Sequence, residues 1–156
     1  MPVTKLSSFL FLLFVFFTSV ALSQVLKVVD GDTIHLDGEK IRFSGIDAPE
    51  VNQTCILQNQ IIECGLTSKQ LIINKIGDQK VTCLREGKDQ YGRTLAECFV
   101  GGDSLSRFLV RQGFAFAYRQ HSKKYTPDED FARENSIGMW KMNFDFPWDF
   151  RKTKSN

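Results

Sequence analysis

Three short segments of this 156-residue chain concentrate charged side chains in patterns that could act on a phosphate group. The first places two carboxylates, Asp30 and Asp32, on either side of Gly31, between two stretches of alternating apolar and polar residues. Carboxylate oxygens that converge on one spot are the ligands that hard cations such as Ca²⁺ prefer. The same residues are also typical of an ordinary turn, so this segment alone does not distinguish a metal site from a turn.

The second segment runs from Arg42 to Glu50 and combines a guanidinium group with two further carboxylates, Asp47 and Glu50. The planar fork of arginine matches the geometry of a phosphate. An aspartate there could hold a metal, and a glutamate could orient or deprotonate water. The alternative interpretation is a surface ion pair among these charges, which is common in proteins.

The third segment ends a polar stretch with Arg93, two residues after Tyr91. Tyr91 could stack on a base, although the segment alone is also compatible with a polar hairpin loop. Together the three segments supply what hydrolysis of a phosphodiester requires. A metal would polarise the phosphate, guanidinium groups would hold the charge that grows on its oxygens, and a carboxylate would handle the attacking water.

The elements that must position these side chains are five short strands, which the alternation of apolar and polar residues predicts. They span residues 24–30, 32–36, 40–46, 80–85 and 94–100. Asp37-Gly38 predicts a tight hairpin turn between the second and third strands. Polar and turn-forming residues predict loops over 47–59 and 86–93.

Apolar spacing and capping residues predict three helices, over residues 65–76, 103–112 and 126–138. Asp103 is the expected cap of the second helix, and Thr126 with Glu129 matches a capping box at the start of the third. Five strands with helices inserted and appended indicate an α+β fold. We therefore expect a five-stranded OB-fold β-barrel with three α-helices.

Composition and the terminal segments limit the domain organisation. Hydrophobic residues make up 42% of the chain, which is enough for one core, and a net charge of +2 does not by itself indicate a nucleic-acid partner. Residues 1–23 are typical of a secretory signal peptide, because the apolar run 6–22 ends in small residues before a cut after Ser23. An uncleaved membrane anchor over the same run is the alternative. One domain is then expected over residues 24–150, with a flexible basic tail over 151–156.

Four cysteines follow the predicted cleavage site, namely Cys55, Cys64, Cys83 and Cys98. An even number of cysteines behind a signal peptide favours disulfides, and the lack of a C-x-x-C pair argues against zinc. Spacing alone allows more than one connectivity. If the strands over 80–85 and 94–100 pair, Cys83 could face Cys98, which would leave Cys55 to pair with Cys64. The cross-strand register on which this depends is not readable from the sequence.

The three charged segments, V-V-D-G-D-T, I-R-F-S-G-I-D-A-P-E and D-Q-Y-G-R-T, resemble the signature segments of the staphylococcal nuclease-like family in order and spacing. The resemblance extends from about Val25 to Trp140. It implies an OB barrel with three helices, in agreement with the strand and helix pattern. The four cysteines and the stretch around Tyr118 resemble the secreted and periplasmic bacterial branch of this family.

The resemblance also implies roles for the residues that match the motifs. Asp32 and Asp47 resemble the carboxylates that bind calcium, and Ala48 stands where the best-known member has a threonine that offers its backbone carbonyl to the metal. Arg42 and Arg93 resemble the two arginines that bind phosphate.

Glu50 resembles the catalytic carboxylate, and Asp30 resembles a supporting residue. Tyr91 and Tyr118 match two tyrosines that contact the ligand, whereas Gln90 departs from the pattern because it replaces a lysine that contacts the nucleotide. Substrate contacts after Tyr118 do not align with the family.

These implications predict a secreted or periplasmic, monomeric, Ca²⁺-dependent endonuclease without stable membrane association once the signal peptide is removed. Its expected partner is nucleic acid, as single-stranded or breathing DNA or RNA, cut with little sequence specificity to leave 3′-phosphates. Two alternatives remain at this stage. One is a non-catalytic OB-fold module that binds nucleic acid, and the other is an envelope protein anchored by residues 6–22.

Overall fold

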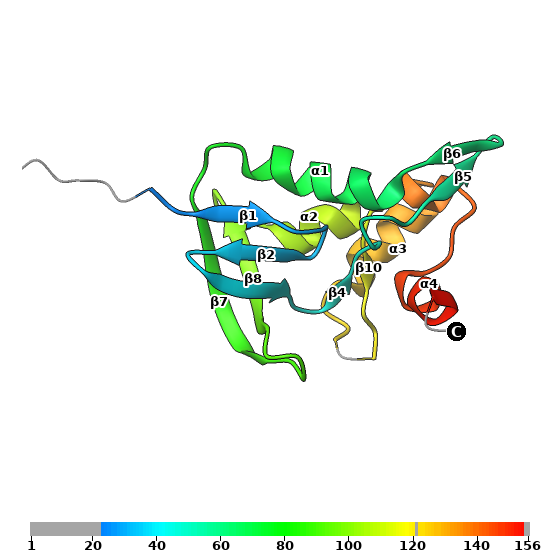
Figure 1. The fold of residues 1–156 in the computed structure, drawn as a ribbon. Helices are drawn as coiled ribbons and strands as arrows, with labels where there is room; N and C mark the ends of the chain where they lie inside the picture. The colour runs from blue at the N-terminus through cyan, green and yellow to red at the C-terminus, as the bar shows by residue number, and fades with distance from the viewer. Residues whose placement is uncertain (1–22, 121, 155–156) are drawn as a thin grey trace, which may run out of the picture.

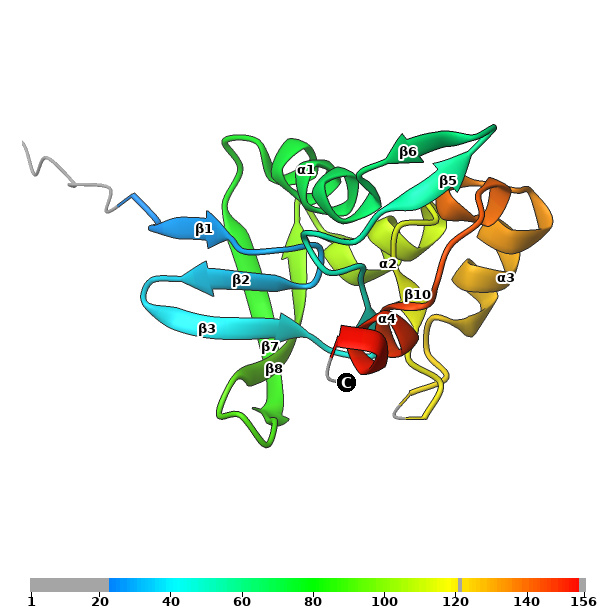
Figure 2. The same ribbon diagram turned by 45° about the vertical axis from the view of Figure 1, so that its right-hand side comes forward.

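The structure, a computed structural model, describes residues 23–120 and 122–154. They form an α+β fold in which a mixed sheet packs against helices, as expected for an OB-like barrel (Figures 1 and 2). The predicted signal peptide lies outside the described residues except for its last position, Ser23, and stays a prediction. Within the described ranges, no helix is both long and apolar enough to cross a membrane.

The main sheet has the strand order β1-β2-β3-β8-β7, with β9 paired to β8. Its strands are β1 (Leu26–Val28), β2 (Thr33–Leu36), β3 (Glu39–Phe43), β7 (Val81–Lys88), β8 (Thr94–Val100) and β9 (Asp103–Ser104). The pair β3–β8 is parallel and the others are antiparallel. The predicted turn joins β2 to β3, and both of its residues, Asp37 (φ 50°) and Gly38 (φ 86°), adopt the left-handed conformation that such hairpin turns require.

Two short sheets extend this core. β4 (Ile46–Asp47) pairs with β10 (Phe116–Ala117), and β5 (Cys55–Leu57) pairs with β6 (Gln60–Ile62). The loop expected over 47–59 therefore contains part of a β-hairpin, turned by two residues at positive φ, Gln58 and Asn59. β7 likewise continues past a bulge into the loop expected over 86–93. Both loops were predicted too long because these strand residues are mostly polar or exposed and lack the alternation of a half-buried strand.

The described residues form four α-helices, one more than expected. They are α1 (Cys64–Ile76), α2 (Leu105–Arg111), α3 (Thr126–Glu134) and α4 (Pro147–Lys154), with a short 3₁₀-helix η1 (Gly138–Lys141) between α3 and α4. α4 covers most of the segment expected to be a flexible tail. It forms there because its first turn carries Trp148, which packs on a cluster of aromatic side chains. Figure 1 shows α4 beside β4 and β10.

Two predicted helix caps are wrong, for one common reason. Ser104, not Asp103, caps α2 by accepting a hydrogen bond from the Arg107 N–H (3.2 Å), while Asp103 forms an ion pair with Lys75 (2.6 Å). Glu129 does not close a capping box, because its carboxylate accepts the backbone N–H of Ala117 across the fold. In both places a contact between distant elements outcompetes the local capping pattern.

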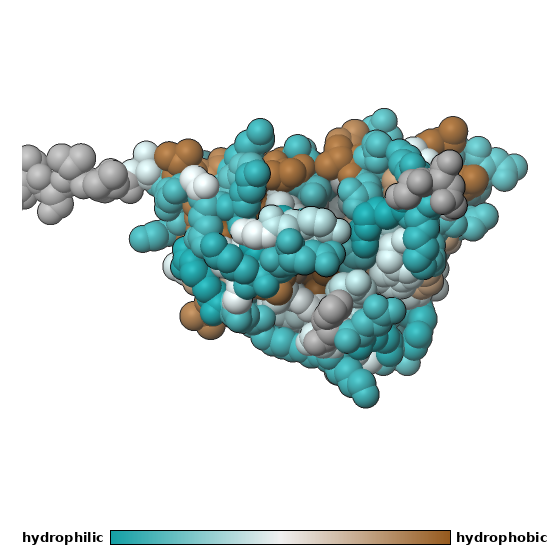
Figure 3. All heavy atoms as spheres, turned by 60° about the horizontal axis from the view of Figure 1, so that its bottom comes forward, coloured by the Kyte–Doolittle hydropathy of each residue, from teal (hydrophilic) through white to brown (hydrophobic). Residues whose placement is uncertain are grey.

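The core has two parts. Barrel strands and helices bury an aliphatic cluster around Ile34, Ile41, Phe43 and Leu105. A second cluster surrounds Phe116 on β10 and consists mainly of aromatic residues that follow α3, namely Trp140, Phe144, Phe146 and Trp148. By contrast, the face of the molecule in Figure 3 is covered mostly by hydrophilic side chains.

The four cysteines form the pairs expected from the strand pattern. Cys83 and Cys98 lie directly opposite each other in the β7–β8 ladder and form a disulfide. Cys55 and Cys64 form the other and join β5 to the first residue of α1. This second disulfide ties the chain segment that follows β4, which carries charged residues, to the start of α1.

Candidate active site

Two buried aspartates from different strands meet beneath one arginine. Asp32 precedes β2 and Asp47 ends β4, and their exposed fractions are 2% and 0%. The β2–β3 register places Thr33 opposite Arg42, so the Arg42 side chain reaches both carboxylates. Its two terminal nitrogens donate to Asp32 Oδ1 (2.5 Å) and Asp47 Oδ1 (2.8 Å). The first two charged segments of the sequence therefore converge on one centre.

The negative charge of this centre is only partly compensated. Asp32 accepts hydrogen bonds from the Ala48 backbone N–H (2.8 Å) and the Thr33 hydroxyl (3.0 Å), besides that from Arg42. Burial nevertheless raises the pKa of Asp32 to about 7, and the charges of Asp30 and Asp47 add to this against the opposing effect of Arg42. A buried carboxylate with so high a pKa is stabilised in its charged form by a further cation.

Close packing around Gly31 explains why a glycine stands between the two aspartates of the first segment. A Cβ atom at this position would overlap the Ser68 hydroxyl on α1 and the Ala48 side chain. The strand junction therefore lies directly against α1 and the residue after β4. The Asp30 carboxylate accepts the Asp32 backbone N–H (3.0 Å) within this bend, so it supports the backbone at Asp32.

Glu50 lies at the rim of the centre, with 39% of its side chain exposed. The backbone of its loop is tied down by Gln53, which donates to the Glu50 carbonyl (2.8 Å) and accepts the Glu50 N–H through its side chain (3.3 Å). Gly65 on α1 packs so closely that a Cβ atom there would overlap the Glu50 carbonyl oxygen. The loop thus presents a half-exposed carboxylate beside a buried pair.

A second arginine, Arg151, joins Arg42 in this cluster, and the sequence did not predict it for this site. Arg151 on α4 donates to Asp47 Oδ2 (2.7 Å) and to Glu50 Oε1 (3.0 Å). Hydrogen bonding to Asp47 raises the pKa of Arg151. The sequence signal that could have located it is Pro147, a helix-starting residue, followed by Trp148 and Arg151 at a spacing that shares one helix face.

The third charged segment is arranged differently. Arg93 forms an ion pair with Asp89 on its own turn (2.7 Å) and lies over the Tyr91 ring at 5.7 Å. Although burial opposes it, hydrogen bonding from Arg93 lowers the pKa of Asp89. Arg93 thus forms its ion pair within its own turn. Arg42 and Arg151, by contrast, pair with the buried aspartates. Tyr91 is 76% exposed.

Tyr118 is brought close to the aspartate cluster by the pairing of β10 with β4. It directly follows β10, whose Phe116 pairs with Asp47, and its backbone N–H donates to the Gly45 carbonyl (3.0 Å). Its ring stacks on Trp148 of α4, with centroids 6.3 Å apart. The predicted substrate-binding tyrosine therefore belongs to the same corner of the fold as Arg151.

The donor chemistry at this centre suits a hard cation. The carboxylates of Asp32 and Asp47 and the backbone carbonyl of Ala48 are oxygen ligands of the type that Ca²⁺ takes. Among residues 23–120 and 122–154, however, no cluster of three or more acidic, histidine or cysteine side chains could by itself hold a metal. A cation on Asp47 would have to displace Arg151 and take its remaining ligands from water or phosphate.

Comparisons with known proteins agree with this geometry. The family described as staphylococcal nuclease homologue matches residues 40–142. An uncharacterized endonuclease of Haemophilus influenzae is 32% identical over 127 residues, which cover 77% of this chain and 66% of that protein. The succinoglycan biosynthesis protein ExoI of Rhizobium meliloti is 31% identical over 119 residues, covering 74% of this chain and 62% of that protein.

The chain thus spans just under two thirds of the length of these two relatives. A thermonuclease of Staphylococcus intermedius is 32% identical over 133 residues, and here the match covers 75% of this chain and 74% of the relative. The family match includes Arg42, Asp47, Glu50 and Arg93 and extends over more than half of the chain. The chain therefore belongs to the staphylococcal nuclease homologue family.

Proposed function

We propose that this protein is a Ca²⁺-dependent endonuclease that hydrolyses phosphodiester bonds of DNA and RNA with little sequence specificity. The observation that carries the proposal is the pair of buried carboxylates, Asp32 and Asp47, bridged by Arg42 and bordered by the half-exposed Glu50. The family's nuclease members and the thermonuclease relative support it.

Each residue has a distinct role in the proposed reaction. Asp32, Asp47 and the Ala48 carbonyl would hold Ca²⁺, which supplies a positive charge against a phosphate oxygen when bound. Glu50 aligns the attacking water and accepts its proton. Water oxygen bonds to phosphorus, the bond from phosphorus to the 5′-oxygen breaks, and that oxygen takes up a proton from solvent, leaving a 3′-phosphate.

Arginines stabilise the charge that develops on the phosphate. Arg42 is oriented by its two aspartates, which keep its guanidinium plane fixed. Arg93 would leave Asp89 to contact the substrate, as would Tyr91 on the same exposed turn. No base-edge recognition is required. Within single strands, and within breathing duplexes, we therefore expect different base sequences to be cut with similar efficiency.

The proposed setting is outside the cytoplasm, as a monomer. Two disulfides favour an oxidising compartment, which agrees with the signal peptide expected over residues 1–23. The non-catalytic alternative, an OB-fold module that binds nucleic acid, has the same fold and the same expected location, and it differs in having no hydrolytic activity.

The test is cleavage of heat-denatured and duplex DNA by the disulfide-bonded protein, with Ca²⁺ or with EGTA. We expect Ca²⁺-dependent cutting that is faster on denatured DNA and leaves 3′-phosphate ends. Absence of cutting by the folded protein at any Ca²⁺ concentration would contradict the proposal and favour the binding module.

A further inference from the structure

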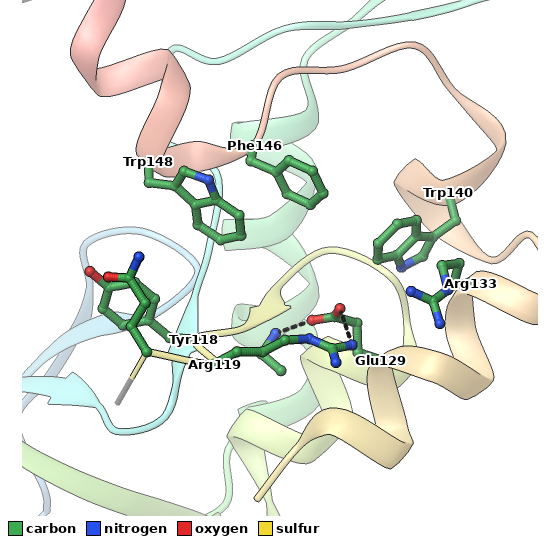
Figure 4. A pocket seen from close by; sticks show the side chains of 9 residues that line it. Tyr118, Arg119, Glu129, Arg133, Trp140, Phe146 and Trp148 are labelled. Atoms are coloured by element: carbon green, nitrogen blue, oxygen red, sulfur yellow. Dashed lines mark hydrogen bonds and ion pairs between the residues drawn. The ribbon is translucent and has the colours of Figure 1, made fainter. Parts of the chain in front are cut away.

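A pocket of about 390 Å³ opens beside the aspartate cluster, between β10, α3, η1 and the start of α4. Figure 4 shows the side chains that surround it. Aromatic rings form one part of its lining, and two arginines with one glutamate form another. The volume lies within the range of small-molecule sites. Tyr118, which the family resemblance assigns to substrate contact, is one of its lining residues, whereas the other lining residues have no role in the proposed reaction.

The aromatic wall is flat and preorganised. Trp148 stacks on Phe146 with ring centroids 4.6 Å apart and an interplanar angle of 7°, and it also stacks on Tyr118. These rings are partly exposed, so their position is held by neighbouring rings and part of their surface stays open. Such rings are platforms on which nucleobases stack without regard to sequence.

The polar side of the pocket presents two part-exposed guanidinium groups. Arg119 is held by Glu129 (2.9 Å) and Asp130 (3.1 Å), and 46% of its side chain stays exposed. Arg133 is paired with Asp130 (2.8 Å) and is 52% exposed. Glu129 is itself occupied, because it also accepts the Ala117 backbone N–H. Two guanidinium groups therefore line the pocket, and both carboxylates that pair with them, Glu129 and Asp130, are already engaged.

One donor in the lining also needs an acceptor. Within the described part of the chain, the Trp140 Nε1–H is buried and has no hydrogen-bond partner. A buried donor without an acceptor is unfavourable. In Figure 4 the indole nitrogen lies on the side of the pocket where Arg133 reaches in. An oxygen-rich group placed there would contact the cationic side chains, and it would reach this donor only after a shift of the Trp140 ring.

We infer that this pocket binds one nucleotide of a single-stranded nucleic acid, with the base against the exposed part of the aromatic wall and the phosphate toward Arg119 and Arg133. The inference rests on the proposed function for the class of ligand. The pocket shares β10 and α4 with the aspartate cluster, since Phe116 pairs with Asp47 and α4 carries both Trp148 and Arg151. The bound nucleotide therefore flanks the phosphodiester that is cut.

Tryptophan fluorescence reports on this pocket directly, because both tryptophans of the chain line it. We would titrate the full disulfide-bonded protein in EGTA with single-stranded oligothymidylate and, separately, with oligouridylate. We expect at least one of the two oligonucleotides to quench the fluorescence in a saturable way. The oligonucleotide that binds with the higher affinity identifies DNA or RNA as the better source of the nucleotide. No quenching by either would overturn the inference, as would equal quenching by inorganic phosphate alone.

Arg133→Ala should weaken this binding about fivefold or more, the loss of one charged phosphate contact. Arg107→Ala is the matched control, because Arg107 is similarly exposed (55%) and also pairs with one aspartate, but lies outside the pocket. Equal affinities of the two variants would contradict the inference.

Ca²⁺-dependent cleavage, measured on the same samples, separates this inference from the proposed function. Quenching without cleavage would uphold the pocket and reject the nuclease. Cleavage without quenching would uphold the nuclease and reject the pocket.

Discussion

Arg42 and Arg151 contact the same aspartate but differ in how firmly they are held. Arg42 has 15% of its side chain exposed and bridges two buried carboxylates. Removal of one partner from a buried ion pair typically costs about 3–5 kcal/mol, so Arg42 holds the centre together as well as serving the proposed chemistry. Arg151 is 40% exposed and contacts Asp47 from outside. A cation bound at Asp47 would have to replace this arginine and its contacts to Asp47 and Glu50.

Arg151→Ala should therefore make Ca²⁺ bind more tightly. Because Asp47 is buried and Arg151 contacts it through two hydrogen bonds, this ion pair should contribute more than the roughly 1 kcal/mol of an exposed pair. The Ca²⁺ concentration for half-saturation should therefore fall by about fivefold or more. Calorimetric titration with Ca²⁺ measures this. Lys152→Ala is the control, because the neighbouring Lys152 pairs with Asp149 on the same helix. Unchanged or weaker Ca²⁺ binding by Arg151→Ala would contradict competition at Asp47.

The residues of the buried cluster could be predicted because each lies in a short segment whose residue types already indicate its chemistry. Asp32, Arg42 and Asp47 meet as those segments suggested. Arg151 could not be predicted in this way, because its contact with Asp47 spans 104 residues and depends on how α4 packs. A basic residue near a chain end carries no local pattern that indicates such a contact.

At the scale of elements, α1 determines where Glu50 lies. The close approach of Gly65 to the Glu50 carbonyl leaves no space for a side chain, and the Cys55–Cys64 disulfide fixes the same end of the helix. The loop after β4 is consequently braced by the helix that follows it. Precise placement of a catalytic carboxylate requires such support.

Gly65→Ala should push the Glu50 loop away from α1. Overpacking of this kind typically costs about 1–3 kcal/mol of stability, and misplacement of a reacting group lowers the rate by up to about a hundredfold. Urea unfolding and the DNA cleavage rate measure the two effects. Thr67→Ala, a change at a part-exposed position on the same helix, is the control. A Gly65→Ala variant with normal stability and rate would show that the close approach is unimportant.

Elements were predicted well where their apolar pattern was strong. The strands β2 and β3 and the turn between them appear as expected. The β5–β6 hairpin was missed because each strand has three residues and several of them are exposed. α4 was missed because its stabilisation comes from Phe116 and the other rings of a distant cluster, and not from its own polar sequence.

At the scale of the whole molecule, Glu97 links the barrel to the segment that enters α3. Its carboxylate on β8 accepts the Tyr125 hydroxyl (2.8 Å) and pairs with Lys124. Burial acts to raise the pKa of Glu97, but hydrogen bonds from Lys124 and Tyr125 outweigh it and lower the pKa below the ordinary value of 4.5. Because the folded state lowers this pKa, the stabilisation is complete above pH 4.5 and is lost as the pH falls through the folded-state value.

Glu97→Gln should cost about 1.5–3 kcal/mol at neutral pH, the range for hydrogen bonds to charged groups. The difference from the wild type should shrink as the pH is lowered below 4.5. Urea unfolding of both proteins across this range measures it, with exposed Glu134→Gln as the control. A difference that stays constant with pH would rule out the charge of Glu97 as its origin.

The most direct test of the proposed site is the rate at which Glu50→Gln cuts single-stranded DNA in saturating Ca²⁺. This variant keeps the size of the side chain and removes its ability to accept a proton, whereas Glu63→Gln makes the same change at an exposed position before α1. Loss of a general base lowers a rate by roughly 10²–10⁴-fold, and we expect a decrease of that size for Glu50→Gln alone, with unfolding unchanged. A folded Glu50→Gln protein that cuts within a fewfold of the wild-type rate would contradict hydrolysis at this centre.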